Sequence, residues 1–231
     1  MVNKEISSAD EAVSNVQDDA VIMVGGFGPA GQPTELINAL MRRRPRGLTL
    51  ISNNAGNGDD GLAALMKSGC VRKIICSFPR QSDSWVFDEL YRQKKIELEL
   101  VPQGNLVARI QAGGSGLGAI FTPTGYGTQL TEGKETRLID GRHYVLETPL
   151  TAHFSLIKAQ RADRWGNLTF NKAGRNFGPI MAPASRCTIV EVSEMAGLGE
   201  LDPEAIVTPG IYVSRVVHVP AVQTHFLAQG A

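Results

Sequence analysis

The chain of 231 residues lacks several features that would point to particular classes of protein. It has no excess of charge, because 23 Lys and Arg residues balance 23 Asp and Glu residues. Charge therefore predicts neither a nucleic acid nor an anionic membrane as partner. No apolar run approaches the length of a membrane span. Residues 1–10 are polar and lack the apolar core of a secretion signal, so we expect a cytoplasmic protein that acts on small molecules or binds another protein.

Cysteine is also scarce. The three cysteines, Cys70, Cys76 and Cys187, have neither C-x-x-C spacing nor another spacing typical of a metal site. An odd and sparse set of cysteines indicates reduced thiols, and small buried apolar side chains are their simplest interpretation. We therefore expect no metal ion.

What the sequence does contain is an alternation of short apolar runs and amphipathic stretches. The runs predict strands at Ala20–Val24, Leu48–Ile51, Val71–Cys76 and Ile96–Val101. The stretches that follow them predict helices at Pro33–Arg43, Leu62–Ser68, Ser84–Arg92 and Asn105–Gln111. Continuous apolar strands are typical of strands buried on both faces. The alternation predicts an α/β fold with an open, mainly parallel sheet sandwiched by helices.

The alternation breaks near residue 113. Residues 113–128 are rich in Gly, Thr and Pro, which predicts a long loop. The pair Asp140-Gly141 lies between two short apolar runs, Thr136–Ile139 and His143–Glu147, and predicts a β-hairpin. We interpret this hairpin as a small insertion in the α/β domain.

The last third of the chain predicts two further core strands, at Phe154–Ala159 and Cys187–Val192. Residues 164–183 contain Gly, Asn and Pro without a clear period, so we expect irregular backbone there. We place a single domain at residues 1–219 and a C-terminal tail, without regular structure, at residues 220–231.

A glycine-rich loop follows the first predicted strand. The segment Gly25-Gly26-Phe27-Gly28-Pro29-Ala30-Gly31 joins that strand to the next helix. Glycine permits positive φ and lets the backbone approach a ligand, and a helix N-terminus offers free N–H groups and partial positive charge. The loop suits a phosphate, a carboxylate or a developing oxyanion, although a plain strand-to-helix turn is an equal alternative. It has neither a Walker A sequence nor a strict G-x-G-x-x-G pattern.

Polar side chains follow each of the next three predicted strands. Asn53 and Asn54 follow the second, Ser77 and Arg80 follow the third, and Gln103 follows the fourth. The carboxyl ends of parallel strands meet at one edge of a sheet, which is where ligands bind in such folds. Neutral amides can donate hydrogen bonds to a carbonyl or an oxyanion, and an arginine can bind a carboxylate. Taken singly, each residue fits an ordinary turn or a solvated loop equally well.

Several segments, taken together, resemble the alpha subunits of family I coenzyme A transferases. The resemblance runs from about residue 10 to residue 219, and its one departure is an Asp18-Asp19 pair where the family has an acid followed by glycine. The matching segments are Ile22–Phe27 with Gly31-Gln32-Pro33, Ser52–Gly56, Pro102-Gln103-Gly104, Thr122–Thr128, Asp163–Asn167 and Ala173–Phe177.

Within that family, residues 76–90 look like the 3-oxoadipate transferase branch. The resemblance implies transfer of CoA from succinyl-CoA to 3-oxoadipate, a step in the breakdown of aromatic compounds through the beta-ketoadipate pathway. It implies no cofactor, since the CoA thioester is itself a substrate. The roles it implies are Gln103 and Asn53 on the thioester and oxyanion side, Arg80, Asn54 and Ser77 toward the acid, and CoA binding by Gly25, Gly26, Phe27, Gly28, Pro29, Ala30 and Gly31.

The family's nucleophile is a glutamate in a Ser-Glu-Asn-Gly motif on the beta subunit, and this chain has no such motif. Its nearest counterpart, Ser193-Glu194-Met195-Ala196, lacks the Asn-Gly turn. The resemblance therefore implies a hetero-oligomer in which this chain is inactive without its beta partner. The alternatives are the same mechanism with acetoacetate or another short 3-oxo acid, a phosphosugar-isomerase-like enzyme with its own acid–base carboxylate, and a binding protein without catalytic activity.

Overall fold

The computed structural model describes residues 2–220. Within these residues nine strands form one sheet, in the order β1-β12-β11-β9-β2-β3-β4-β5, with β10 paired to the side of β9. The strands are β1 (Glu5–Ile6), β2 (Val21–Val24), β3 (Leu48–Ile51), β4 (Val71–Cys76), β5 (Glu97–Leu100), β9 (Ala152–Asp163), β10 (Leu168–Thr169), β11 (Ser185–Ala196) and β12 (Arg215–His218). All neighbours in the main order are parallel, and β10 alone is antiparallel. The predicted open, mainly parallel sheet is confirmed.

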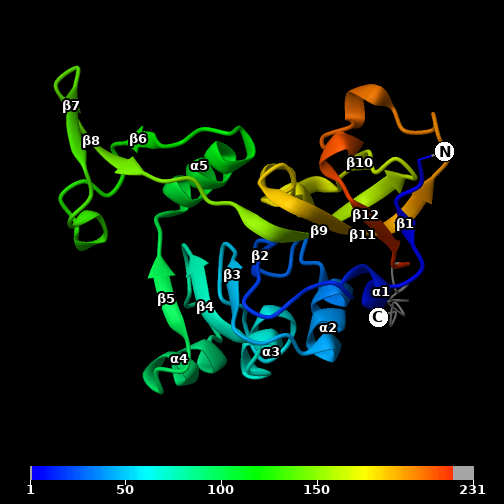
Figure 1. Cartoon of the computed structure of the whole chain (residues 1–231), viewed down its shortest axis with the longest axis horizontal. Coiled ribbons are helices and arrows are strands. Elements are labelled where there is room, and N and C mark those ends of the chain that lie inside the picture. Colours follow the sequence, from blue (N-terminus) through cyan, green and yellow to red (C-terminus); the bar gives the residue numbers. More distant parts are fainter. Residues whose placement is uncertain (1, 221–231) are drawn as a thin grey trace, which may run out of the picture.

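The direction in which the chain fills the sheet changes beside β2. Strands β3, β4 and β5 follow on one side of β2, whereas β9, β11 and β12 lie on its other side (Figure 1). Such a switch leaves a crevice at the carboxyl ends of the central strands, because the connections leave in opposite directions there. The glycine loop begins at this point, directly after β2.

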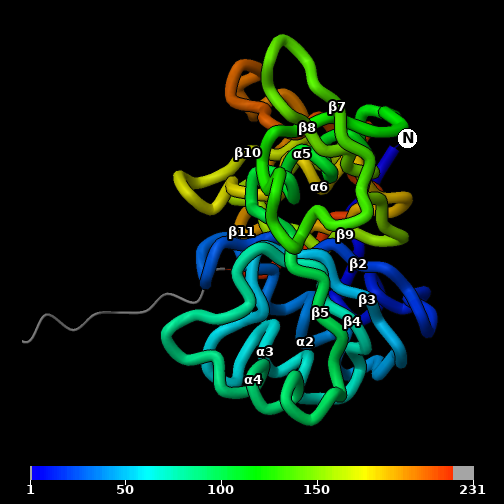
Figure 2. Tube along the Cα trace, turned by 90° about the vertical axis from the view of Figure 1, so that its left-hand side faces the viewer, coloured from blue at the N-terminus to red at the C-terminus, as the bar shows by residue number. Residues whose placement is uncertain are grey.

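Helices cover both faces of the sheet, as expected for parallel strands with crossover connections. Figure 2 shows α2, α3 and α4 on one side of the sheet and α5 and α6 on the other. The helices are α1 (Ala9–Ala12), α2 (Thr34–Arg43), α3 (Gly61–Lys67), α4 (Trp85–Arg92), α5 (Gln103–Gly114) and α6 (Gly178–Met181), with 3-10 turns η1 (Gln129–Thr131), η2 (Lys172–Arg175), η3 (Pro203–Ala205) and η4 (Gly210–Tyr212). No helix in residues 2–220 combines the length and the apolar character that crossing a membrane requires.

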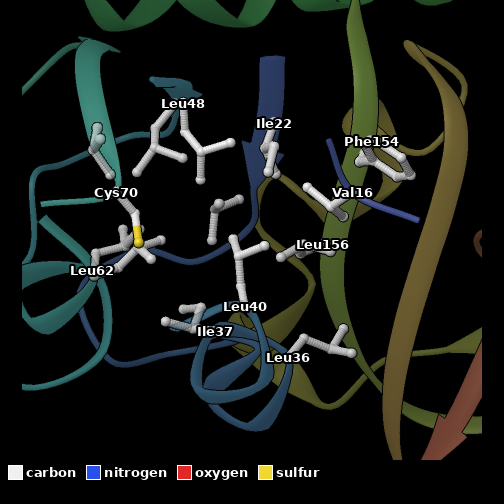
Figure 3. Packing of buried hydrophobic residues seen from close by; sticks show 14 of the residues in the cluster. Val16, Ile22, Leu36, Ile37, Leu40, Leu48, Leu62, Cys70, Phe154 and Leu156 are labelled. Atoms are coloured by element: carbon white, nitrogen blue, oxygen red, sulfur yellow. The ribbon is translucent and has the colours of Figure 1, made fainter. Parts of the chain in front are cut away.

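The two faces of the sheet have separate hydrophobic cores. Successive strand residues point to opposite faces, so Ile22 packs into the core beneath α2, whereas Met23 packs into the core on the α5 and α6 side. Figure 3 shows Leu36, Ile37 and Leu40 of α2 directed toward the sheet. The continuous apolar runs of the sequence thus arise from burial on both faces.

A second, three-stranded antiparallel sheet projects from the α5 side (Figure 1). It consists of β6 (Ile120–Thr122), β7 (Thr136–Ile139) and β8 (Arg142–Glu147). The predicted hairpin at Asp140-Gly141 is confirmed, with φ of 47° and 75° at these two residues. The expectation of one long loop over residues 113–128 was wrong in part, because Ile120–Thr122 pairs with β8. Such a short strand is stabilised by its distant partner, which a local pattern does not reveal.

Other boundaries differ from the sequence predictions in instructive ways. Helix α5 begins at Gln103, earlier than the predicted residue 105, because Pro102 serves as its N-cap. Strands β9 and β11 each run for 12 residues, well beyond the short segments predicted. They lengthen because their outer ends pair with each other. The tail predicted at residues 220–231 lies outside the described residues except for its first residue.

Candidate active site

A cavity of about 800 Å³ opens at the carboxyl edge of the sheet, next to the switch in strand direction. Its wall contains six residues that the sequence singled out: Phe27, Gly28, Asn53, Ser77, Arg80 and Gln103. Three more residues, Phe78, Gln81 and Ser82, complete the wall and come from the loop after β4. The expected convergence of the strand ends is therefore present in the structure.

Asn53 is the centre of the polar network in this cavity. Its Oδ1 accepts hydrogen bonds from Gln103 Nε2 at 2.7 Å and from Ser77 Oγ at 2.9 Å. Asn53 is buried, whereas Gln103 is exposed. Since Oδ1 is occupied twice and Nδ2 makes no hydrogen bond to any described residue, the network fixes the amide so that its N–H₂ group remains a donor.

Arg80 reaches the same cavity from an exposed position. Its Nε donates to Asp88 Oδ1 of α4 at 2.5 Å, and its side chain is 62% exposed. The hydrogen bond from Arg80 to Asp88 raises the pKa of the guanidinium further above its ordinary value. The remaining guanidinium N–H groups can face a carboxylate in the cavity, while solvent screens the pair with Asp88.

Asn54 lies apart from the other predicted site residues. It lines a second cavity of about 350 Å³, which shares Gly28 and Gln81 with the first. Its Oδ1 accepts from the Gly56 N–H at 2.9 Å, a local turn interaction. Asn54 therefore combines a structural contact with a place beside the second cavity, where its binding role stays a prediction.

The glycine loop has the backbone conformation that its glycines suggest. Gly26, Gly28 and Gly31 have φ of 127°, 59° and 71°. However, its N–H groups are mostly used inside the protein. Gly25 donates to the Leu156 carbonyl, Gly26 to Asn176 Oδ1, and Phe27 and Ala30 donate to each other's carbonyls.

The N–H groups of Gly28 and Gly31 make no hydrogen bond to any described residue. Gly28 lines both cavities, whereas Gly25 and Gly26 are buried and Gly31 lies beside a third, smaller cavity. The anion cradle expected along the whole loop is therefore reduced to one backbone donor at the cavity, Gly28, with Phe27 exposed beside it.

The N-terminus of α2 is not free for a ligand, which corrects a sequence expectation. Oε2 of Glu191 accepts from the N–H groups of Glu35 and Leu36 at 2.9 and 3.1 Å. Oε1 of the same carboxylate pairs with Lys158 Nζ at 3.0 Å. Glu191, on β11, is 1% exposed, so the positive end of the helix is neutralised from within. An acidic residue within the apolar run 187–192 was the available signal for this role.

Glu194, the nearest counterpart of a nucleophile motif, lies on the surface of β11. It pairs with Arg161 at 2.9 Å and is 54% exposed. Neither residue lines the 800 Å³ cavity. This placement gives Glu194 no contact with the candidate site.

The thiol nearest the cavity is held in its neutral form. Cys76 is the last residue of β4 and is fully buried, and burial raises its pKa to about 12. A thiol with this pKa is a poor nucleophile at neutral pH. Among residues 2–220, no three His, Cys, Asp or Glu side chains gather as a metal site would require. The chemistry available in this chain is therefore hydrogen-bond donation and charge pairing around an acyl group.

Comparison with known families identifies the class to which such a site belongs. Residues 6–219 match the family model described as Coenzyme A transferase. The chain therefore belongs to the coenzyme A transferase family.

Particular relatives narrow the comparison. The chain is 63% identical over 229 residues to one of the two chains of the 3-oxoadipate CoA-transferase of Pseudomonas putida, covering 99% of each sequence. It is 62% identical to the chain of the same name from Acinetobacter baylyi, covering 95% of this chain and 96% of that one. It is 47% identical to a chain of the succinyl-CoA:3-ketoacid coenzyme A transferase of Xanthomonas campestris, covering 93% and 88%.

Solved structures agree on the fold. An acyl-CoA transferase from Escherichia coli O157:H7, determined as a thioester complex with CoA, superposes with a TM-score of 0.81 at 25% identity. The match covers 94% of this chain but 47% of that one, so this chain spans about half the length of that enzyme. Glutaconate coenzyme A-transferase from Acidaminococcus fermentans, with a TM-score of 0.84 at 20% identity over 94% of this chain and 76% of that one, shares the fold.

Proposed function

We propose that this chain is the alpha subunit of a two-subunit transferase that moves CoA from succinyl-CoA to 3-oxoadipate. The observation that carries the proposal is identity of 63% and 62%, over nearly the whole chain, to two proteins named for that substrate. Identity to a relative named for 3-ketoacids is lower, at 47%. The acceptor is therefore a dicarboxylic 3-oxo acid in preference to acetoacetate. The reaction belongs to the breakdown of aromatic compounds, and sparse cysteine fits the reducing cytoplasm as its location.

The proposed reaction has two half-reactions on one glutamate of the partner subunit. Its carboxylate attacks the succinyl-CoA carbonyl, forming an anhydride and releasing the CoA thiolate. The thiolate then attacks the glutamyl carbonyl of the anhydride, which leaves a glutamyl-CoA thioester and frees succinate. 3-Oxoadipate repeats these steps in reverse, taking up CoA and restoring the glutamate. Kinetics of the ping-pong type follow from the covalent intermediate.

Each attack on a carbonyl produces a tetrahedral oxyanion, and this chain supplies neutral donors for it. The amide of Asn53 keeps an unused N–H₂ group because Gln103 and Ser77 occupy its oxygen. Gln103 holds Asn53 and has a further amide hydrogen of its own. Fixed donors of this kind stabilise developing charge without moving during the reaction.

The remaining wall of the cavity suits the acid and the CoA arm. Arg80 faces the distal carboxylate of 3-oxoadipate, with Ser77 and Asn54 nearer the strand ends. The Gly28 N–H and the exposed Phe27 face the CoA thioester, and Gly25, Gly26, Pro29, Ala30 and Gly31 shape that surface. None of the described residues in the cavity wall is a carboxylate, which fits a nucleophile contributed by another chain.

Reconstitution with a candidate partner tests the proposal. The pair, incubated with succinyl-CoA, should carry a glutamyl-CoA adduct on the partner and none on this chain, as measured by mass spectrometry. A panel of acids should then give a higher kcat/KM with 3-oxoadipate than with acetoacetate. An adduct on this chain, or full activity of this chain by itself, would refute the division of roles. A preference for acetoacetate would support the alternative acceptor.

A further inference from the structure

The segment Ala173–Phe177 matches a family motif but has no part in the catalytic scheme above. In the structure it lies against the glycine loop, although the two are far apart in the sequence. The contact runs through Asn176, whose Oδ1 accepts from the Gly26 N–H at 3.1 Å and whose Nδ2 donates to the Ala30 carbonyl at 2.9 Å. One side chain thus joins the two ends of the loop's tight turn.

The other hydrogen bonds of Asn176 anchor it to its own segment. Oδ1 also accepts from the Phe177 N–H at 2.7 Å, and Nδ2 also lies within hydrogen-bond distance of the carbonyls of Ala173 and Gly174 at 2.9 and 3.3 Å. Every partner is a main-chain group. Both ends of the amide are therefore used, and no other residue type presents two such acceptors and donors at this length.

The two segments also fit closely where no side chain intervenes. A Cβ on Gly31 would lie 2.3 Å from the Gly174 carbonyl oxygen and 2.7 Å from Asn176 Nδ2. Gly31 has a φ of 71°, which a side chain would also disfavour. The contact therefore depends on glycine at 31 as well as on the amide of Asn176.

The part of the loop held in this way is the part that reaches the cavity. β2 ends at Val24 and α2 begins at Thr34, so neither strand nor helix fixes the residues between them. Phe27 and Ala30 bond to each other, and Asn176 bonds on both sides of them, at Gly26 and Ala30. The positions of Phe27 and Gly28 in the cavity wall follow from these bonds.

We propose that Asn176 is a positioning residue for the reaction: it holds the glycine loop so that Phe27 and the Gly28 N–H meet the CoA thioester. This role rests on the proposed function for its kinetic consequence, whereas the structural part stands independently. Misplacement of a positioned group by about 1 Å can cost about 100-fold in rate. We expect a loss of about 10- to 100-fold in kcat/KM for succinyl-CoA when Asn176 is replaced.

Two variants, Asn176→Ala and Asn176→Asp, test the role in the reconstituted two-subunit enzyme. Asn176→Asp keeps the shape and the acceptor but turns an oxygen toward three carbonyls, so it should be at least as damaging as Ala. Asn167→Ala is the matched control. The side chain of Asn167 also binds the main chain, accepting from the Gly210 N–H at 2.8 Å, but in a turn that does not line the cavity.

Hydrogen exchange provides a readout that global destabilisation alone would not produce. Amides of residues 25–31 should exchange faster in both Asn176 variants, with α3 unchanged, and the kinetic loss should exceed that of Asn167→Ala. Unchanged exchange at 25–31, or equal kinetic losses in the variants at positions 176 and 167, would overturn the proposal. If Asn176→Ala fails to fold, Asn176→Asp decides. A wild-type pair inactive on succinyl-CoA would instead count against the proposed function, and the exchange result would still judge the contact.

Discussion

Two polar regions of this molecule differ in how completely their groups are paired. Around Glu191, the carboxylate binds two helix N–H groups and Lys158, and it is almost fully buried. At the carboxyl edge, Asn53 and Gln103 bond to each other yet keep unused N–H groups toward an open cavity. The first region joins β11, β9 and α2, whereas the second has hydrogen-bonding capacity left for a substrate. Spare donors in a cavity, more than polarity itself, mark the functional region.

The largest expected effect is on stability, at Glu191. Glu191→Ala should lower the free energy of unfolding by about 3–5 kcal/mol, because it strands Lys158 and two helix N–H groups. Glu194→Ala is the matched control on the same strand, with an exposed partner, and should cost less than about 1 kcal/mol. Urea unfolding of the purified chain measures both. Equal costs at the two positions would remove the distinction between a closed and an open ion pair. Glu194→Ala should also leave transferase activity intact.

The open region should give the opposite result, a large loss of rate with little loss of stability. Gln103→Ala should lower kcat about 100- to 1000-fold while binding of the thioester changes less, because an oxyanion donor acts mainly in the transition state. Gln111→Ala, on an exposed part of the same helix, should leave the rate unchanged. Steady-state kinetics of the reconstituted pair test this. A kcat equal to that of the wild type would exclude Gln103 from the reaction.

Arg80 sharpens the comparison by testing charge at the rim of the cavity. Arg80→Ala should reduce kcat/KM about 10- to 100-fold for 3-oxoadipate, since a hydrogen bond to a charged group contributes about 1.5–3 kcal/mol. Acetoacetate, which has no distal carboxylate, should be affected much less. Arg92→Ala provides a control on α4, outside the cavity wall. Equal losses on both acids would mean that Arg80 does not read the second carboxylate.

The smallest expected effect concerns Glu99, which belongs to a half-closed ion cluster. Burial raises the pKa of Glu99, but hydrogen bonds from Lys73 and Arg109 outweigh it, and the net pKa is lowered from 4.5. A lowered pKa in the folded state means that this stabilisation is present above pH 4.5 and is lost as the pH falls through the folded value. Glu99→Gln should therefore be less stable than wild type at pH 7, and the gap should close in acid.

Unfolding curves collected across this pH range measure the effect. Glu97→Gln is the control on the same strand, because Glu97 is more exposed, at 62% against 34% for Glu99. A gap that stays constant with pH would show that Glu99 does not contribute through its charge.

The sequence predicted the parts of the fold and the site that depend on local pattern. Apolar runs located β3 and β4, an Asp-Gly pair located the hairpin, and position after a strand was enough to bring Asn53 and Gln103 together. The missed features depend on residues that meet across the fold. Asn176 stood in a quoted motif without a role, and Glu191 stood inside a strand as an unexplained acid. Both act on segments more than a hundred residues away, which no local period can report.

The placement of β2 beside β9 has a consequence for how the site comes into being. The two strands at the middle of the sheet come from opposite halves of the chain, and Gly25 bonds to Leu156 across their junction. Closing so long a stretch of chain is entropically costly and makes folding slow. The crevice exists only once that junction has formed, so a nascent or truncated chain with perfect β2–β5 structure would still have no binding pocket. Ligand binding therefore reports that this chain has folded to completion.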